Sequence, residues 1–302
     1  MSDKKVSVMK LLYYPGCTLK TSAKNLEKSA MAVMELFGHE MIEMKDWNCC
    51  GVVASLTDDD LMHHLAPLRN LIHAEDEGQD TIITLCDMCY NTLKQTNLRV
   101  KENPDDLETL NLFMDREHDY KGSVRIMHFL EFLRDEIGFD AIRKKVKNPL
   151  TAMKIMPYYG CMLLRPREVA IDDAEEPRIL QDLITALGGE VVDNPFKIEC
   201  CGSYNTIEET DLVSKRAYSI TNHAIERGGD AIALSCPLCR FNVDVRGKEA
   251  EKLFDNYKQL PVYYYTQLLA VALGLDEHSY GFEDHAVDPV LLLKKKGVFK
   301  TT

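Results

Sequence analysis

The sequence of 302 residues lacks the features that mark several large classes of protein. Its net charge of −12 leaves no excess of basic residues, which argues against nucleic acid as a partner because phosphate binding needs a basic face. The most apolar run, 263–275, is far shorter than the ~20 residues of a membrane-spanning helix, so we expect no membrane span. No apolar stretch of signal-peptide type follows residues 1–5. We therefore expect a soluble, cytoplasmic protein.

The sequence also lacks a nucleotide-binding motif. No Gly-x-Gly-x-x-Gly follows a predicted strand, so we expect the chain itself to bind neither flavin nor nicotinamide. The composition is otherwise that of a globular protein, with 45% hydrophobic residues, 28% charged residues and no low-complexity tract. A chain of this length is long enough for two ordinary domains, each with its own core.

What the sequence does have is ten cysteines, which fall into two sets of five with the same layout. Each set has one cysteine directly after a glycine, then a Cys-Cys-Gly triplet, then a Cys-x-x-Cys. The first set reads C-x31-CC-x35-C-x-x-C and the second C-x38-CC-x34-C-x-x-C. The members are Cys17, Cys49, Cys50, Cys86 and Cys89 in the first set, and Cys161, Cys200, Cys201, Cys236 and Cys239 in the second.

Ten cysteines in a reducing compartment are not expected to form structural disulfides, which leaves metal binding or redox chemistry. A structural zinc usually takes two Cys-x-x-Cys pairs a short loop apart, whereas the pairs here stand at 86–89 and 236–239. A thioredoxin-like pair leaves three thiols of each set unexplained. An ordinary cubane iron–sulfur cluster needs four thiolates, and a fifth, adjacent one suits a cluster with a bridging thiolate or an opened core. Zinc in one half stays open as an alternative.

Short apolar runs of strand type alternate with helical patterns in both halves, and each cysteine group follows such a run. The predicted strands are 6–14, 40–44, 81–85, 153–156, 190–192 and 231–235, and the predicted helices lie within 21–38, 58–78, 179–187 and 208–228. This alternation predicts mostly parallel sheets, and the loops after the strands are where open α/β sheets place their ligands. We expect an α/β fold of two tandem, pseudo-symmetric, Rossmann-like domains, 1–148 and 149–302.

The doubled five-cysteine pattern resembles the CCG domain, and two complete copies resemble the B subunit of soluble heterodisulfide reductase. The resemblance covers the chain from Tyr13 to about Gly274. It implies that each set of five cysteines holds a noncubane [4Fe-4S] cluster, and that a disulfide bound between the two clusters is cleaved in two one-electron steps. It also implies two partners, a ferredoxin-like subunit of the C type and a flavoprotein of the A type, which feed electrons in.

Residues close to Cys161 are candidates for substrate contacts. Arg165 and Arg167 can grip an anionic group such as a sulfonate, carboxylate or phosphate, with an ordinary surface salt bridge as the alternative. Tyr159 is a candidate proton donor, as are Tyr14 and Tyr158, with packing beside a strand end as the alternative. Met162 stands where methanogen members of the family often carry His, which argues against the methanogenic heterodisulfide as substrate.

Two further functions stay open. The chain can be an electron relay within a larger oxidoreductase, with no disulfide substrate of its own. In that case the interface between the halves should be closed, without a pocket that reaches both clusters. It can also be a zinc-bearing scaffold that docks partners, and this protein would be colourless where an iron–sulfur protein is brown.

Overall fold

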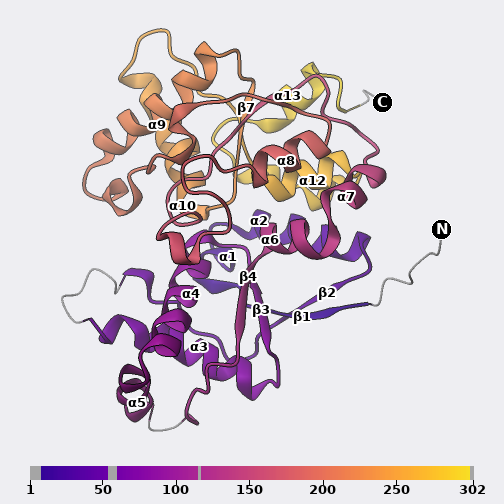
Figure 1. The fold of residues 1–302 in the computed structure, drawn as a ribbon. Helices are drawn as coiled ribbons and strands as arrows, with labels where there is room; N and C mark the ends of the chain where they lie inside the picture. The colour runs from indigo at the N-terminus through magenta and orange to yellow at the C-terminus, as the bar shows by residue number, and fades with distance from the viewer. Residues whose placement is uncertain (1–7, 54–59, 115–116, 300–302) are drawn as a thin grey trace.

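The computed structural model describes residues 8–53, 60–114 and 117–299, and these form two lobes of similar construction (Figure 1). The strands are β1 Lys10–Tyr13, β2 Glu40–Glu43, β3 Thr81–Thr84, β4 Arg125–His128, β5 Lys154–Pro157, β6 Glu190–Val191, β7 Ala231–Leu234 and β8 Val262–Tyr264. They form two wholly parallel sheets, ordered β2-β1-β3-β4 and β6-β5-β7-β8. The second sheet repeats the first strand for strand, and the predicted α/β fold with parallel sheets is confirmed.

Helices connect the strands of both sheets. In the first lobe they are α1 Gly16–Leu19, α2 Lys24–Leu36, α3 Leu65–Asp76, α4 Asp87–Glu102, α5 Pro104–Leu112, α6 Phe129–Phe132 and α7 Phe139–Lys145. In the second they are α8 Ile179–Ala186, α9 Thr210–Glu226, α10 Pro237–Arg240, α11 Gly247–Glu249, α12 Tyr265–Ala272 and α13 Pro289–Lys295. Wider π-type turns, Leu133–Ile137 and Phe241–Arg246, continue α6 and α10.

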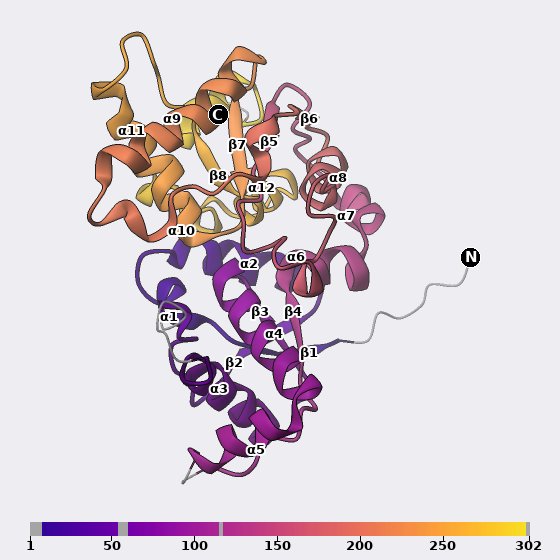
Figure 2. The same ribbon diagram turned by 60° about the vertical axis from the view of Figure 1, so that its left-hand side comes forward.

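The two lobes pack directly on one another, with the orange and yellow C-terminal lobe stacked on the indigo and magenta N-terminal lobe (Figure 2). Helix α2 buries its apolar face, including Leu26 and Val33, and packs against α12 of the other lobe. A buried hydrogen bond of 2.7 Å joins the hydroxyls of Ser29 and Thr266 at this contact. The division of the chain after residue 148 stays a prediction.

Helix α3 starts later than the sequence pattern predicts. Residues 58 and 59 lie outside the described part of the chain, and Met62–His64 form a short 3-10 turn before α3 begins at Leu65. Pro67 explains the start, because proline has no N–H and is tolerated in the first turn of a helix but not in its interior. The fourth strands, β4 and β8, were not assigned from the sequence.

The strand order positions the cysteines. In the first sheet β2 lies on one side of β1, and β3 and β4 lie on the other side. The second sheet repeats this order, so β1 with β3, and β5 with β7, flank a topological switch point. Ligands of open α/β sheets bind outside the carboxyl ends of the strands at such points. The cysteine loops follow these strands. Within the described residues, no helix combines the length and apolarity needed to cross a bilayer.

Candidate functional site

The ten cysteines gather at the carboxyl edges of the two sheets, as the sequence predicts. Cys17 lies in α1 just after β1, the Cys49–Cys50 pair follows β2, and Cys86 directly precedes α4. The second set repeats these positions around β5, β6 and β7. Exposure differs between the sets, because Cys17 and Cys49 are exposed whereas their counterparts Cys161 and Cys200 are half-buried.

The thiols of each set lie close enough to share protons. The Sγ atoms of Cys17 and Cys49 are 4.0 Å apart. Hydrogen bonds from Cys49 and Cys89 lower the pKa of the Cys50 thiol and raise the pKa of these two partners. In the second set, the hydrogen bond between Cys161 and Cys200 lowers the pKa of Cys200 and raises that of Cys161. Each set therefore favours one thiolate, which is the form of cysteine that binds metals.

Two glycines bring the backbone against these sulfurs. A Cβ on Gly16 would lie 2.8 Å from Sγ of Cys89, and a Cβ on Gly160 would lie 2.9 Å from Sγ of Cys239. Both glycines have a positive φ, 68° and 64°, which other residues adopt only with strain. The close approach and the five thiols fit a thiolate-bound iron–sulfur cluster. Among the described residues, no three His, Cys, Asp or Glu side chains are grouped as ligands of one metal ion.

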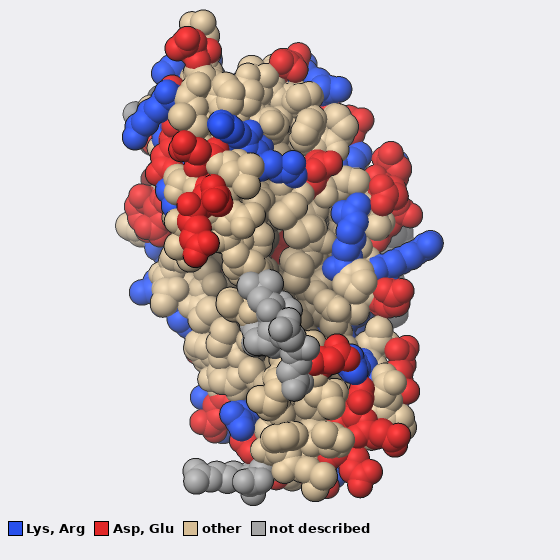
Figure 3. All heavy atoms as spheres, turned by 90° about the vertical axis from the view of Figure 1, so that its left-hand side faces the viewer, with Lys and Arg blue, Asp and Glu red and all other residues tan. Residues whose placement is uncertain are grey.

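A cavity of about 270 Å³ borders the first cysteine set, and its described lining contains no cysteine of the second set. Its described lining residues are uncharged and come from both lobes: Cys17, Thr18, Ser22, Cys49, Cys50, Val52, Val53, Cys86, Met88 and Cys89 from the first, and Tyr204, Thr206, Ile207, Pro237, Leu238 and Phe241 from the second. Figure 3 shows one face of the molecule, on which uncharged surface lies between groups of charged side chains. All five cysteines of the first set line this cavity, so a cluster bound by them would occupy part of its space.

The second set borders a much smaller space of about 10 Å³, which is barely enough for one water molecule. Cys161, Cys201, Cys236 and Cys239 line it. Met88 and Leu238 line both this space and the larger cavity. They occupy the same position in the two Cys-x-x-Cys motifs. We call this pair the apolar partition between the two cysteine sets.

A buried carboxylate joins the two Cys-x-x-Cys loops. Asp87, which follows Cys86, accepts a hydrogen bond of 2.8 Å from the hydroxyl of Ser235, which precedes Cys236. Nε2 of His128 lies 3.2 Å from the carbonyl oxygen of Leu85, to which it can donate, and also 3.2 Å from the other carboxylate oxygen of Asp87. Because Nδ1 of His128 accepts from the N–H of Leu130, Nε2 is the nitrogen that carries the proton. This chain of contacts fixes the two loops relative to each other.

One turn further along α4, a second polar contact crosses to the other lobe. The side-chain amide of Asn91 donates to the carbonyls of Met162 and Arg165, both at 2.7 Å. These carbonyls belong to the loop after Cys161, so α4 holds two of the three cysteine loops of the second set.

The residues predicted to contact substrate lie elsewhere. Arg165 forms an ion pair with Glu175 at 3.2 Å and donates to the carbonyl of Ile198, while Arg167 is exposed. The hydroxyl of Tyr159 donates to the carbonyl of Pro177. None of Arg165, Arg167 and Tyr159 is among the described residues that line the 270 Å³ cavity. The contacts of Arg165 match the salt-bridge interpretation, and a role for the three residues in substrate binding stays a prediction.

Tyr14 and Tyr158 have equivalent structural roles in the two lobes. The hydroxyl of Tyr14 donates to the carbonyl of Asn48, just before Cys49, and that of Tyr158 donates to the carbonyl of Glu199, just before Cys200. Burial, followed by the nearby thiols, raises the pKa of both phenols above its ordinary value. Each tyrosine therefore remains protonated and fixes the loop that carries a Cys-Cys pair.

Tyr204 is a cavity residue that the sequence did not reveal. Its hydroxyl is buried and has no hydrogen-bond partner among the described residues. Burial, and then the thiols of Cys50 and its neighbours, raise the pKa of this phenol above its ordinary value. The only signal was positional: Tyr204 comes three residues after Cys201, where the first half has Val53.

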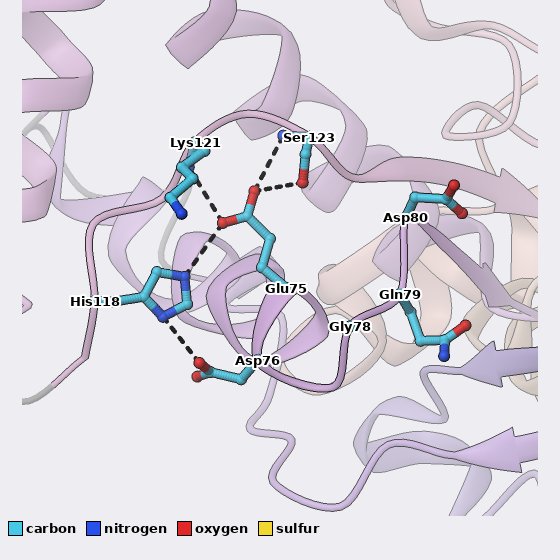
Figure 4. A pocket seen from close by; sticks show the side chains of 8 residues that line it. All are labelled: Glu75, Asp76, Gly78, Gln79, Asp80, His118, Lys121 and Ser123. Atoms are coloured by element: carbon cyan, nitrogen blue, oxygen red, sulfur yellow. Dashed lines mark hydrogen bonds and ion pairs between the residues drawn. The ribbon is translucent and has the colours of Figure 1, made fainter.

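A larger depression of about 520 Å³ lies at the opposite, amino edge of β3 (Figure 4). Glu75, at the end of α3, is fully engaged there. It accepts hydrogen bonds from the backbone and hydroxyl of Ser123 and from the N–H of Lys121, and its carboxylate pairs with His118. These contacts tie the segment before β4 to α3, so we interpret this depression as structural.

Comparison with known proteins places these features in a family. The profile of the cysteine-rich CCG domain matches residues 11–94 and 155–244. The B subunit of the ferredoxin/F420H2-dependent CoB-CoM heterodisulfide reductase of Methanosarcina acetivorans is 29% identical over 297 residues, which cover 95% of this chain and 96% of that protein. The membrane anchor subunit of the 8-methylmenaquinol:fumarate reductase of Wolinella succinogenes is 27% identical over 282 residues, 93% of this chain and 98% of that protein.

A solved structure shares the fold. A hypothetical protein from Helicobacter pylori superposes with a TM-score of 0.73 at 12% sequence identity, over 92% of this chain and 53% of that one. This chain thus spans about half of that protein, and the likeness concerns the fold alone. Because the domain profile matches both halves and more than half of all residues, the chain belongs to the cysteine-rich CCG domain family, of which it carries two copies.

Proposed function

We propose that this chain is the catalytic iron–sulfur subunit of a heterodisulfide-reductase-like complex and that it cleaves a disulfide reductively. The observation that carries the proposal is the pair of complete five-thiol sets, joined through the Asp87–Ser235 hydrogen bond, with one set open to a cavity. The relatives named as the B subunit of heterodisulfide reductase, which align over nearly the whole chain, support the same assignment.

The cysteines would hold two [4Fe-4S] clusters of the noncubane type, one in each of the domains 1–148 and 149–302. The first cluster would take Cys17, Cys49, Cys50, Cys86 and Cys89, and the second Cys161, Cys200, Cys201, Cys236 and Cys239. When bound, such clusters supply electrons singly, and cleavage of a disulfide consumes two. We assign the complex to the cytoplasm, where free thiols stay reduced.

The reaction adds two electrons and two protons to a disulfide and releases two thiols. The electrons would come from a ferredoxin-like subunit of the C type and a flavoprotein of the A type. The residues of this chain shape the site: the apolar side chains of Val52, Met88 and Leu238 lie beside the cysteines of the first set. Cleavage between the two sets requires that Met88 and Leu238, the apolar partition, move aside.

An electron relay is a second candidate, and the apolar partition favours it. Of the two cavities that border the described cysteines, the larger is lined by cysteines of the first set and the smaller by cysteines of the second. One relative belongs to a methylmenaquinol:fumarate reductase. In this alternative the first set would receive electrons from a partner or a quinol and the second would pass them on, without disulfide cleavage.

Iron and acid-labile sulfide per chain, measured on anaerobically purified protein, test the proposal together with a paramagnetic-resonance spectrum before and after addition of thiols. About eight irons per chain are expected for two four-iron clusters. A new thiol-dependent signal supports disulfide chemistry. Eight irons without a response to thiols favours the relay, and zinc or no iron at all contradicts both candidates.

A further inference from the structure

One side chain near the second cysteine set donates a hydrogen bond directly to a cysteine sulfur. Asn242 lies in the π-type turn Phe241–Arg246, three residues after Cys239, and is fully buried. Its side-chain nitrogen lies 3.3 Å from Sγ of Cys201, the second member of the Cys-Cys pair. The same nitrogen donates to the carbonyl of Ser203 at 3.1 Å. Asn242 therefore joins the turn after the Cys-x-x-Cys motif to the sulfur of another loop.

The neighbours of this side chain fix which end of the amide faces the sulfur. The carbonyl oxygens of Ser203 and Cys201 lie 3.1 and 3.5 Å from the nitrogen, and carbonyl oxygens only accept hydrogen bonds. A rotated amide would place its own oxygen against both of them. The side-chain oxygen of Asn242 has no hydrogen-bond partner among the described residues. The amide thus has one N–H for the sulfur and one for the carbonyl of Ser203.

The bond to Ser203 supports an uncommon backbone conformation. Ser203 directly follows the Cys-Cys-Gly triplet and has a φ of 45°, a value that residues other than glycine adopt infrequently. By accepting from Asn242, the carbonyl of Ser203 fixes this loop against the π-type turn. The contact between the amide and Cys201 is therefore a fixed part of the buried structure.

The corresponding donor of the first set is a threonine. The hydroxyl of Thr92, three residues after Cys89, forms a hydrogen bond with the thiol of Cys50 and also donates to the carbonyl of Met88 at 2.8 Å. A hydroxyl carries one hydrogen, so the sulfur and the carbonyl compete for it. Thr92 is also half-buried and lies in the regular helix α4. Of the two equivalent positions, only Asn242 supplies an N–H that the sulfur does not share.

A hydrogen bond to a cysteine sulfur changes the electron affinity of a cluster bound through that sulfur. Reduction by one electron adds one negative charge, part of which lies on the sulfur ligands. The N–H dipole stabilises this charge, so hydrogen bonds to the sulfurs raise the reduction potential. Burial strengthens the effect, because the local dielectric constant is low.

We propose that Asn242 is a positioning residue that raises the reduction potential of the second cluster through its hydrogen bond to Cys201. The inference rests on the proposed function for the presence of two clusters, and it deepens that function by naming a residue that favours an electron on the second set. The step concerned adds one electron from a reductant to the cluster. No bond forms or breaks, and the amide keeps both of its hydrogens.

An anaerobic redox titration of the full chain with its clusters, followed by paramagnetic resonance, tests the inference. Dithionite supplies the electrons, so neither thiol nor disulfide is added. Asn242→Leu has a similar size and no donor, and Asn242→Thr copies the first set. In both, the midpoint of one cluster should fall and the other should stay unchanged. For Asn242→Leu we expect about a tenfold change in the one-electron equilibrium constant, which corresponds to a shift of about 59 mV.

Reciprocal and control variants complete the test. Thr92→Asn should raise the midpoint of the first cluster, and Cys201→Ala, which removes a ligand of the second, shows which midpoint belongs to which set. Ser203→Gly is the control, since it keeps the carbonyl that accepts from Asn242 and should leave both midpoints unchanged. Only variants with the iron content of the wild type are compared.

Two results would overturn the inference. One is an unchanged second midpoint in the Asn242 variants, and the other is an equal shift of both midpoints. If Asn242→Leu loses iron, Asn242→Thr and Thr92→Asn decide the question, and an unchanged first midpoint in Thr92→Asn then contradicts it.

The titration separates this inference from the proposed function, because no disulfide takes part in it. If the second midpoint falls in the Asn242 variants while no thiol changes the spectrum, disulfide cleavage fails and the role of Asn242 stands. If a thiol changes the spectrum but the midpoints of the variants equal those of the wild type, disulfide chemistry stands and the role of Asn242 fails.

Discussion

The two halves carry the same five thiols in the same order on the same sheet, but only the first half exposes them to a cavity. The difference arises after the first cysteine of each set. In the first half, residues 18–23 separate Cys17 from α2, whereas in the second half the longer stretch 162–178 separates Cys161 from α8. This longer segment crosses to the other lobe, where Tyr90 and Arg134 hold the carbonyls of Val169 and Ile171.

This comparison separates two properties that a cysteine pattern alone does not distinguish. The ligand set is duplicated, because the strands and their following loops are duplicated. The space beside the cysteines is not duplicated: the second set borders only about 10 Å³, which Met162, Met88 and Leu238 help to line. In the proposed cleavage, a ligand would therefore meet the first set first and the second only after Met88 and Leu238 move aside.

Removal of one thiol from either set should have the largest effect. Cys50→Ala and Cys201→Ala alter equivalent positions, and each should lower the iron content from about eight to about four per chain. The two variants should differ in their response to ethanethiol, which we expect to be lost in Cys50→Ala and kept in Cys201→Ala. Iron analysis and paramagnetic resonance measure both. Loss of the response in both variants would contradict the division of roles.

Addition of a methyl group at the paired glycines should have the next largest effect. Gly16→Ala and Gly160→Ala each combine a positive φ with a Cβ that contacts a cysteine sulfur, so each should lower stability by about 1–3 kcal/mol and impair cluster retention. Urea unfolding and iron content are the measurements. Gly38→Ala is the control, since Gly38 has a φ of 74° but no atom within 4 Å of the position that a Cβ would take. It should lower stability and leave the iron content unchanged.

Substitution of Glu75, in the depression at the amino edge of β3, should have the smallest effect on stability, and this effect should depend on pH. Burial pushes the pKa of Glu75 up, but hydrogen bonds from Ser123 and its neighbours outweigh this and leave the pKa below its ordinary value. A carboxylate with a lowered folded pKa stabilises the fold above its unfolded pKa, about 4.3, and loses that contribution as pH falls through the folded value. Urea midpoints of wild type and Glu75→Gln should differ at pH 7 and converge below about pH 4. A constant difference across this range would contradict the assignment.

The strands, and the positions of the cysteines that follow them, were predictable from the sequence. Strands such as Thr81–Thr84 have short apolar runs, and the cysteines that follow them lie at the carboxyl edge because parallel strands end together. The start of α3 was not predicted, since the helical pattern continues upstream of Pro67. Tyr204, the apolar partition and the absence of charge in the described cavity lining depend on which loops of the two lobes meet, and no single stretch of sequence contains that information.

The response of the two clusters to one neutral thiol tests the division of roles most directly. Paramagnetic-resonance spectra of the reduced and oxidised protein, with and without ethanethiol, should show one cluster perturbed and the other unchanged. In Leu238→Ala, which thins the partition, the second cluster should also respond. Equal perturbation of both clusters in the wild-type protein, or a second cluster that stays silent in Leu238→Ala, would contradict the account.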